Sequence, residues 1–177
     1  YYQTGKLIFF DASPNFEKIQ SIRGIANTMT GICYYLKSNP DDHQMIGTLK
    51  NLSDKLIRHF HENSTADWKW FESLLAYDNG ILPLALLHAA EILKDDQIKD
   101  VAIQTMDFLT EITLKNGYLS IIGNEKWYKK DGERSIFAQQ PLDALAMILM
   151  FQQAFHLTGD KKYLSNLFTS FMWFLGE

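Results

Sequence analysis

The sequence DWKWFESLLAYDN, residues 67–79, runs directly into the apolar segment ILPLALLHAAEIL, residues 81–93. The second segment is apolar on nearly every face, and Pro83 fits only in the first turn of a helix, so a buried helix is predicted here. The first segment holds four aromatic rings and three carboxylates. Rings beside carboxylates and an amide suit a sugar, because rings stack on its C–H faces and polar groups bind its hydroxyls. The alternative is that Trp68, Trp70 and the neighbouring phenylalanine only fill the gap between two helices.

The composition indicates a globular chain. The chain has 177 residues, 46% hydrophobic and 14% aromatic, which is enough for one domain with a buried core, and we assign residues 1–177 to it. The net charge of −4 is spread along the chain without a basic stripe, which argues against nucleic acid as a partner. No apolar run reaches the length of a membrane span. The chain begins Tyr1-Tyr2-Gln3, so we expect a piece of a longer protein, with a cytoplasmic location preferred.

The sequence offers no clear set of metal or cofactor ligands. Cys33 is the single cysteine, which excludes an internal disulfide, and its apolar neighbours predict a buried, inert thiol. His59 and His61 fall on different faces of a predicted helix, which disfavours shared metal ligation. His88 lies among apolar residues and is expected to be a core histidine with satisfied hydrogen bonds. We therefore predict no metal and no cofactor.

Hydrophobic periodicity predicts six helices and therefore an all-α chain. The predicted helices cover residues 17–37, 42–62, 82–94, 96–115, 141–157 and 161–175. Asp41 or Asp42 is the expected N-cap of the second helix, and Asp95-Asp96 that of the fourth. Residues 7–10, Leu-Ile-Phe-Phe, are expected to form a short strand or a buried tail.

A long connection, residues 116–138, separates the fourth and fifth predicted helices. Connections of this length are usually functional or disordered, and the aromatic content of this one favours order. Weak alternation over residues 118–122 predicts a β-hairpin within it.

The six predicted helices form three pairs. In the second and third pairs the first helix is apolar on nearly all faces, whereas the second helix is amphipathic. We therefore predict helical hairpins stacked side by side, each with a buried inner helix and an outer helix that faces water. Three hairpins leave an apolar flank at each end, so self-association or a missing companion domain is expected.

Several motifs give the chain a resemblance to a known group of helical folds. The motifs are WFE (70–72), LAYDNGILP (75–83), GYL (117–119), IGNEKWY (122–128), QQPLDA (139–144), TGDKKY (158–163) and WFLG (173–176). The chain is similar to the (α/α) toroid proteins of the six-hairpin glycosidase-like superfamily, and more closely to the helical domain attached to some bacterial family 4-type glycosyltransferases. The resemblance covers residues 67–177 well and the first 66 residues weakly. A closed toroid has six hairpins, so the resemblance implies part of an (α/α) toroid, without the nucleotide-sugar-binding domain that transfer needs.

In such toroids the cavity opens at the N-terminal ends of the inner helices. Polar residues precede three predicted inner helices here, at residues 11–15, 77–79 and 139–143. Helix capping alone explains one Asp or Asn at each start. It does not explain Gln139-Gln140 or a second carboxylate as near as Glu72.

The resemblance and these clusters together predict a glycan pocket. Stacking on the sugar and hydrogen bonding to its hydroxyls are assigned to Trp68, Trp70, Asn79, Asn124, Trp127, Tyr128, Gln139 and Gln140. If the chain is catalytic, we expect its acid/base pair among Glu72, Asp78 and Asp143, because glycoside hydrolysis needs two carboxyl groups, one of which holds a proton. The alternative is that Asp78 and Asp143 only cap helices and that Trp127 closes the core.

The expected function is that of a carbohydrate-handling domain associated with a glycosyltransferase, with an oligosaccharide or glycan as its partner. Two alternatives stay open: a fragment of a glycoside hydrolase or sugar epimerase of the same superfamily, and a helical protein-interaction scaffold like the tetratricopeptide arrays. The irregular repeat length and the long aromatic connection disfavour the scaffold.

Overall fold

The computed structural model describes residues 2–176, and this part of the chain is all-α. Its α-helices are α1 (Tyr2–Ala12), α2 (Ile22–Ser38), α3 (His43–Asn63), α4 (Ile81–Leu93), α5 (Asp96–Thr113), α6 (Pro141–Thr158) and α7 (Lys161–Met172). Short 3-10 helices, η1 (Ser13–Lys18) and η2 (Trp173–Leu175), follow α1 and α7. Strands of two residues each are β1 (Leu74–Leu75), β2 (Leu114–Lys115), β3 (Tyr118–Leu119) and β4 (Tyr128–Lys129). None of the helices in residues 2–176 has both the length and the apolar character needed to cross a membrane.

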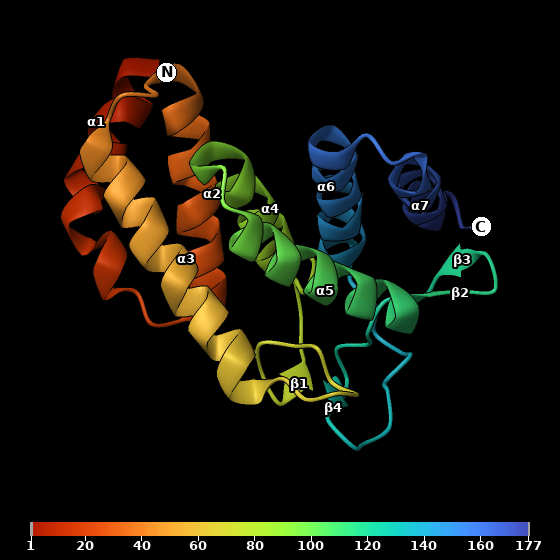
Figure 1. Ribbon diagram of the computed structural model, residues 1–177. Helices are drawn as coiled ribbons and strands as arrows, with labels where there is room; N and C mark the ends of the chain where they lie inside the picture. Colours follow the sequence, from red (N-terminus) through yellow and green to blue (C-terminus); the bar gives the residue numbers. More distant parts are fainter. Residues whose placement is uncertain (1, 177) are drawn as a thin grey trace.

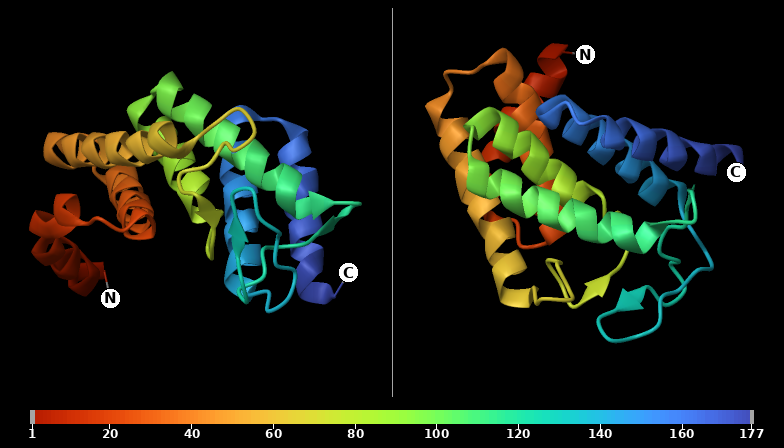
Figure 2. Two further views of the ribbon diagram at one scale, coloured as in Figure 1. Left: turned by 90° about the horizontal axis from the view of Figure 1, so that it is seen from below. Right: turned by 45° about the vertical axis from the view of Figure 1, so that its right-hand side comes forward.

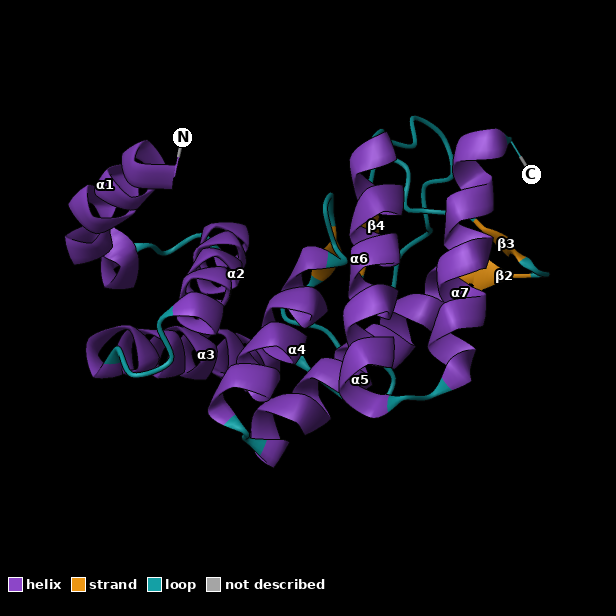
Figure 3. Cartoon of the chain, turned by 90° about the horizontal axis from the view of Figure 1, so that it is seen from above, coloured by secondary structure: helices purple, strands orange, loops and turns teal. Residues whose placement is uncertain are grey.

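Helices α2 to α7 form three hairpins placed side by side, as the repeat predicted. In Figure 3, α2, α4 and α6 follow one another in an arc, α3 and α5 lie on its convex side, and α1 and α7 lie at its two ends. The N-terminal ends of α2, α4 and α6 all point to the lower side of Figure 1, where β1 and β4 lie. Loops from distant parts of the sequence therefore meet at one end of the inner row.

Local signals fix where most of these helices begin. The Asp42 carboxylate accepts a hydrogen bond from the Met45 N–H at 3.0 Å, and Asp95 accepts from the N–H groups of Gln97 and Ile98, which confirms both predicted caps. A side-chain acceptor at the N-cap satisfies a backbone donor that has no partner inside the helix. The six predicted helices are thus confirmed to within a few residues, apart from the start of the first.

The core is centred on α4, which packs against α2, α5 and α6. Residues 82–90 of α4 are all buried, and burying one leucine-sized side chain contributes roughly 1.5–3 kcal/mol. Cys33 of α2 is buried here too, and burial raises the pKa of its thiol to about 12. The predicted burial of this thiol is confirmed, and a protonated thiol is a poor nucleophile.

Helix α6 is less buried than its composition predicted. Leu142, Leu145 and Leu149 are 45%, 46% and 39% exposed. They recur at helical spacing, so one face of α6 is open to solvent. The prediction that this helix is buried on most faces is therefore wrong for the described part of the chain, where no further hairpin covers it.

The N-terminal region also differs from its prediction. Residues 7–10 belong to α1, and Leu7 and Ile8 are 66% and 64% exposed, so neither a strand nor a buried tail forms. Phe9 holds α1 against α2 by stacking on Tyr35 at a ring-centroid distance of 4.9 Å. Helix α2 begins at Ile22 rather than near residue 17, because η1 ends at Lys18 and Ser21 provides the N-cap.

The long connection between α5 and α6 is ordered and folds over the N-terminal end of α6 (Figure 2). Its predicted hairpin is formed by β2 and β3, which pair antiparallel around Asn116-Gly117, two residues with positive φ that suit a tight turn. The guanidinium of Arg134 fastens the hairpin by donating to the Ile112 carbonyl at 2.6 Å and to the Ser120 side chain at 2.7 Å. Strand β4 pairs with β1, which brings residues 127–129 beside the 67–79 stretch.

Candidate functional site

A buried arginine gathers the polar residues at the N-terminal ends of the inner helices. Arg23 of α2 donates from Nε to the Tyr77 carbonyl at 2.6 Å and from its two terminal nitrogens to Glu72 Oε2 at 2.9 Å and Asn79 Oδ1 at 3.4 Å. The Asn79 N–H in turn donates to Asp143 Oδ1 of α6 at 3.4 Å. We call Arg23, Glu72, Asp78, Asn79 and Asp143 the end cluster. It contains all three of the carboxyl groups proposed from the sequence as an acid/base set.

The backbone around α4 makes this convergence possible. Asp78 has a φ of 49°, a left-handed conformation that turns the chain sharply into the helix. Gly80 follows, and a Cβ atom there would lie 2.9 Å from the carbonyl carbon of Ala146. The start of α4 therefore touches the backbone of α6 directly, which brings Asn79 within hydrogen-bonding reach of Asp143.

Burial sets the protonation chemistry of the end cluster. Burial raises the pKa of the Asp143 carboxyl to about 6, with the Asp78 charge adding to the rise, while hydrogen bonds from the Asn79 and Asp78 backbone oppose it. Burial also raises the pKa of Asp78, against the opposing charge of Arg23. A carboxyl group whose pKa lies near 6 holds its proton in mildly acidic solution, as a general acid must.

The end cluster is almost completely shielded from solvent. Asp78, Asn79 and Asp143 are 8%, 3% and 5% exposed, and the cavity beside Asn79 and Asp143 has a volume of about 10 Å³. Its exposed border is formed by Glu72 and by the ring of Tyr77, which is 45% exposed and lies 4.8 Å above the Arg23 guanidinium. Direct contact with a ligand is therefore available at this border and not at the two aspartates.

The two tryptophans of the 67–79 stretch lie in the core. Trp70 is 0% and Trp68 is 4% exposed. Trp70 packs edge-on against Phe71 at 5.2 Å, and Trp68 donates from Nε1 to the Glu72 carbonyl at 2.7 Å. The expectation that a sugar stacks on these rings needs correction, because they fill the gap between helices, which was the alternative interpretation.

The second aromatic pair is divided between core and surface. Tyr128 is half-buried and packs edge-on against Trp68 at 5.4 Å. Trp127 is 38% exposed and has a φ of 58°, and its Nε1 donates to Asn124 Oδ1 at 2.6 Å. A shallow groove of about 630 Å³ runs along Asn124, Trp127 and Gly132. Asn124 and Trp127 therefore meet each other, in a groove separate from the end cluster.

The remaining predicted polar residues have mixed positions. Gln139 accepts a hydrogen bond from Trp173 Nε1 at 2.8 Å and so ties the start of α6 to η2. Gln140 is the N-cap residue of α6 but makes no capping hydrogen bond with its side chain. Residues 11–15 lie at the end of α1 and in η1 rather than at the start of the first inner helix, which corrects that expectation.

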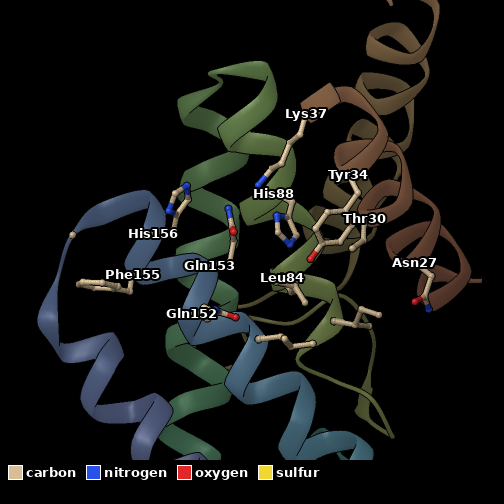
Figure 4. Close-up of a pocket in the computed structure, with 13 residues that line it drawn as sticks. Asn27, Thr30, Tyr34, Lys37, Leu84, His88, Gln152, Gln153, Phe155 and His156 are labelled. Atoms are coloured by element: carbon tan, nitrogen blue, oxygen red, sulfur yellow. The ribbon is translucent and has the colours of Figure 1, made fainter. Parts of the chain in front are cut away.

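Sequence reasoning missed a wide groove on the concave side of the arc. This groove has a volume of about 800 Å³ and lies between α2, α4 and α6. Figure 4 shows Lys37 and Tyr34 of α2, His88 of α4 and Gln153 of α6 lying toward one another, whereas Phe155 points away from them. It is lined by Asn27, Thr30, Tyr34, Lys37, Ile81, Leu84, His88, Leu149, Gln152, Gln153, Phe155, His156 and Gly159. We call it the concave groove.

A single carboxylate ties the three inner helices together at one end of the concave groove. Glu91 of α4 pairs with Lys37 of α2 at 3.1 Å. It also accepts from Gln153 Nε2 at 2.8 Å and lies 3.2 Å from His156 Nε2, both on α6. These partners lower the pKa of Glu91 despite its partial burial. The carboxylate is therefore ionised at neutral pH and balances the charge of Lys37.

His88 lies in the wall of the concave groove and lacks the partners expected of a core histidine. Its side chain is 5% exposed, and its Nδ1 is buried without a hydrogen bond among the described residues. Burial lowers the pKa of His88 to about 4, helped by the charge of Lys37. The ring of Tyr34 lies beside it, with 5.4 Å between ring centroids. The expectation of satisfied hydrogen bonds for His88 was therefore wrong.

Two features of the sequence signal these missed residues. Asn27, Thr30, Tyr34 and Lys37 recur at helical spacing and form a polar stripe on an inner helix. Arg23 is a charge within the apolar stripe of the same helix, between the buried residues Ile22 and Ile25. A charge in such a position is rarely buried without a partner.

The chain matches no protein-family model, no curated protein and no solved structure. Within residues 2–176, no group of three or more His, Cys, Asp or Glu side chains is placed to hold a metal ion.

Proposed function

We propose that the chain is a carbohydrate-handling domain, part of an (α/α) toroid that acts with a glycosyltransferase, and that it binds a glycan at the N-terminal ends of α2, α4 and α6. The observation that carries the proposal is the end cluster. Residues from three separate segments meet there around Arg23, and they leave an exposed tyrosine ring beside a carboxylate at the border.

The border has the two kinds of group that a sugar needs. The exposed ring of Tyr77 offers an apolar surface for the C–H face of a pyranose. Glu72 uses Oε2 for Arg23, and Oε1 has no hydrogen-bond partner among the described residues, so this oxygen is available to a sugar hydroxyl. The Arg23 contacts hold both groups in place before a ligand arrives, which lowers the entropy lost on binding.

A second candidate function is a fragment of a glycoside hydrolase or epimerase. The observation that favours it is the raised pKa of Asp143, about 6, next to the second buried aspartate Asp78. That function requires one of the two aspartates to become uncovered, because both are buried here and a proton can pass only to a sugar in contact with the carboxyl group. If the chain is an enzyme, Asp78→Asn should abolish glycan turnover while glycan binding is retained. If the chain is only a binding domain, the wild type itself should show no turnover.

The test is a glycan array probed with the wild-type chain and with Tyr77→Ala. We expect Tyr77→Ala to weaken binding of the captured glycan by about tenfold, because it removes the exposed ring, and Tyr77→Phe to retain most of the affinity. Tyr118→Ala is the matched control, since Tyr118 is 48% exposed and lies on the β2–β3 hairpin. Equal binding by the wild type, Tyr77→Ala and Tyr118→Ala would place the glycan elsewhere, and binding of a helical peptide instead would favour an interaction scaffold.

A further inference from the structure

We propose that the concave groove is a second sugar-binding position, in which an uncharged pyranose ring stacks on Tyr34 and forms hydrogen bonds with His88 and Gln152. The inference rests on the proposed function, because it extends the glycan from the N-terminal ends of the inner helices along their concave face. It assigns to the chain a site that lies outside the end cluster.

The groove has the size of a ligand site and adjoins the end cluster. Its volume of about 800 Å³ falls in the range of roughly 300–1,000 Å³ that is usual for small-molecule sites. Asn27 lies one turn after Arg23 on α2, and its Nδ2 donates to the Arg23 carbonyl at 2.9 Å. Ile81 follows Asn79-Gly80 directly at the start of α4. The groove therefore begins one helical turn from the end cluster.

Tyr34 supplies the stacking surface. Its side chain is 60% exposed although it lies on an inner helix, and Figure 4 shows it between Lys37 and Thr30 on the wall formed by α2. The Lys37 ammonium lies 6.0 Å from the centroid of the Tyr34 ring. The ring of His88, on the neighbouring helix α4, also lies beside the Tyr34 ring. An exposed aromatic ring bordered by polar groups suits a sugar, whose faces are apolar and whose edges carry hydroxyls.

His88 supplies the polar contact that points to a ligand. His88 is 95% buried, yet its ring lines the groove and makes no hydrogen bond to any described residue. Its Nδ1 is a buried polar atom without a partner, and a turn of the ring about the Cβ–Cγ bond is needed for this atom to meet a hydroxyl in the groove. Buried polar groups in native proteins nearly always have partners, so such an exception asks for a missing one. A neutral imidazole has one donor and one acceptor nitrogen, and a sugar hydroxyl both donates and accepts, so the two are complementary.

The charges of the groove favour an uncharged ligand. The Lys37 ammonium is paired with Glu91 at 3.1 Å, and the same carboxylate engages Gln153 and His156. An anionic ligand that approaches Lys37 also approaches the Glu91 carboxylate, which repels it. The attraction to the lysine is therefore largely cancelled. The exposed amide of Gln152 has no partner among the described residues and offers a donor and an acceptor to a hydroxyl.

The test titrates the full chain with maltotriose, cellotriose and mannotriose, and with trigalacturonate as an acidic probe, by isothermal calorimetry. We expect at least one neutral trisaccharide to bind. Tyr34→Ala should weaken it by about tenfold, as expected for loss of a stacked ring, and Gln152→Ala by a smaller factor. Tyr34→Phe should retain the affinity, and Tyr118→Ala should leave it unchanged. His88→Phe should also weaken binding, because it removes the imidazole. Tyr34 and Gln152 are exposed, so their variants keep the test valid if His88→Phe does not fold.

The possible results separate this inference from the proposed function. If Tyr77→Ala weakens binding while Tyr34→Ala and Gln152→Ala do not, the groove is not a sugar site and the proposed function stands. If trigalacturonate binds more tightly than every neutral trisaccharide, the groove takes an acidic ligand and the inference of an uncharged sugar is overturned. If none of the four probes binds, the inference fails for these sugars, and the glycan array decides the proposed function separately.

Discussion

Two sets of polar contacts, one in the end cluster and one beside the concave groove, join the same three helices. We call each set a tie. At the N-terminal ends, Arg23 of α2, Asn79 before α4 and Asp143 of α6 form a chain of hydrogen bonds. Farther along, Lys37, Glu91 and His156 connect the same helices in the same order. The first tie is buried and encloses a cavity of about 10 Å³, whereas the second is partly exposed and borders a groove of about 800 Å³. The comparison shows that one set of contacts is sealed within the row of helices, whereas the other lies beside open space.

The largest expected difference between the two ties is in stability. Arg23→Met removes a guanidinium that donates to Glu72 Oε2, Asn79 Oδ1 and the Tyr77 carbonyl, and all three oxygens lose that donor. Breaking such a buried set costs about 3–5 kcal/mol. Lys37→Met removes an ammonium that is 37% exposed, for which a loss of roughly 0–1 kcal/mol is expected. Urea denaturation of both variants measures the difference in the free energy of unfolding.

Arg58→Met is the control for the loss of a positive charge. Arg58 is exposed on α3, so its replacement should change the free energy of unfolding by less than about 0.5 kcal/mol. Similar losses in Arg23→Met and Lys37→Met would mean that the end cluster is not the stronger of the two ties.

The two regions are also expected to respond to pH in opposite directions. His88, in the groove, has a pKa of about 4 in the folded state against an ordinary value of 6.5. Between these values the unfolded chain binds the proton and the folded chain does not, so the stability due to His88 is lost as the pH falls. Since one pKa unit corresponds to about 1.4 kcal/mol, the loss between pH 6.5 and pH 4 is roughly 3 kcal/mol.

Asp143, in the end cluster, has the opposite effect over nearly the same range. Its pKa rises from an ordinary value of 3.8 to about 6 in the folded state. Between these values the folded chain binds the proton and the unfolded chain does not, so the protein gains stability as the pH falls, by roughly 3 kcal/mol in all. The two contributions nearly cancel in the wild type.

Single substitutions should separate the two contributions. In His88→Gln the free energy of unfolding should rise relative to the wild type as the pH is lowered from 6.5 to 4, because the loss due to His88 is absent and the gain due to Asp143 remains. In Asp143→Asn it should fall over the same range. Urea denaturation at several pH values measures both slopes, and parallel pH profiles for the wild type and the two variants would show that these groups titrate normally in the folded chain.

Local patterns account for the parts of the fold that the sequence predicted well. The six helices follow from hydrophobic periodicity, and caps such as Asp42 and Asp95 act on N–H groups two or three residues away. The convergence of Glu72, Asp78 and Asp143 at one end was expected from the resemblance to the toroids, whose cavity opens at the N-terminal ends of the inner helices, and from the polar residues at equivalent helix starts.

Contacts between distant segments explain what the sequence could not predict. The partners of Arg23 lie 49 to 56 residues away, so its burial depends on how α2 packs against the loop before α4. The composition of the 67–79 stretch is the same whether its tryptophans face a sugar or the core, and their burial follows from packing against Phe71 and Tyr128. The groove at His88 exists only because three helices form an arc, which no local pattern encodes.

The smallest expected effect compares two glycines, one in each region. A Cβ at Gly80 would meet the Ala146 backbone at 2.9–3.0 Å, so Gly80→Ala must push α4 and α6 apart and should lose about 1–3 kcal/mol of stability. Gly31 lies on the same stripe of α2 as Asn27 and Tyr34, and a Cβ there meets no atom within 4 Å. Gly31→Ala should therefore gain about 0.5–1 kcal/mol from its better helix propensity. Thermal or urea denaturation measures both changes. Equal effects of the two substitutions would contradict the difference between close packing at the end cluster and open space beside Gly31.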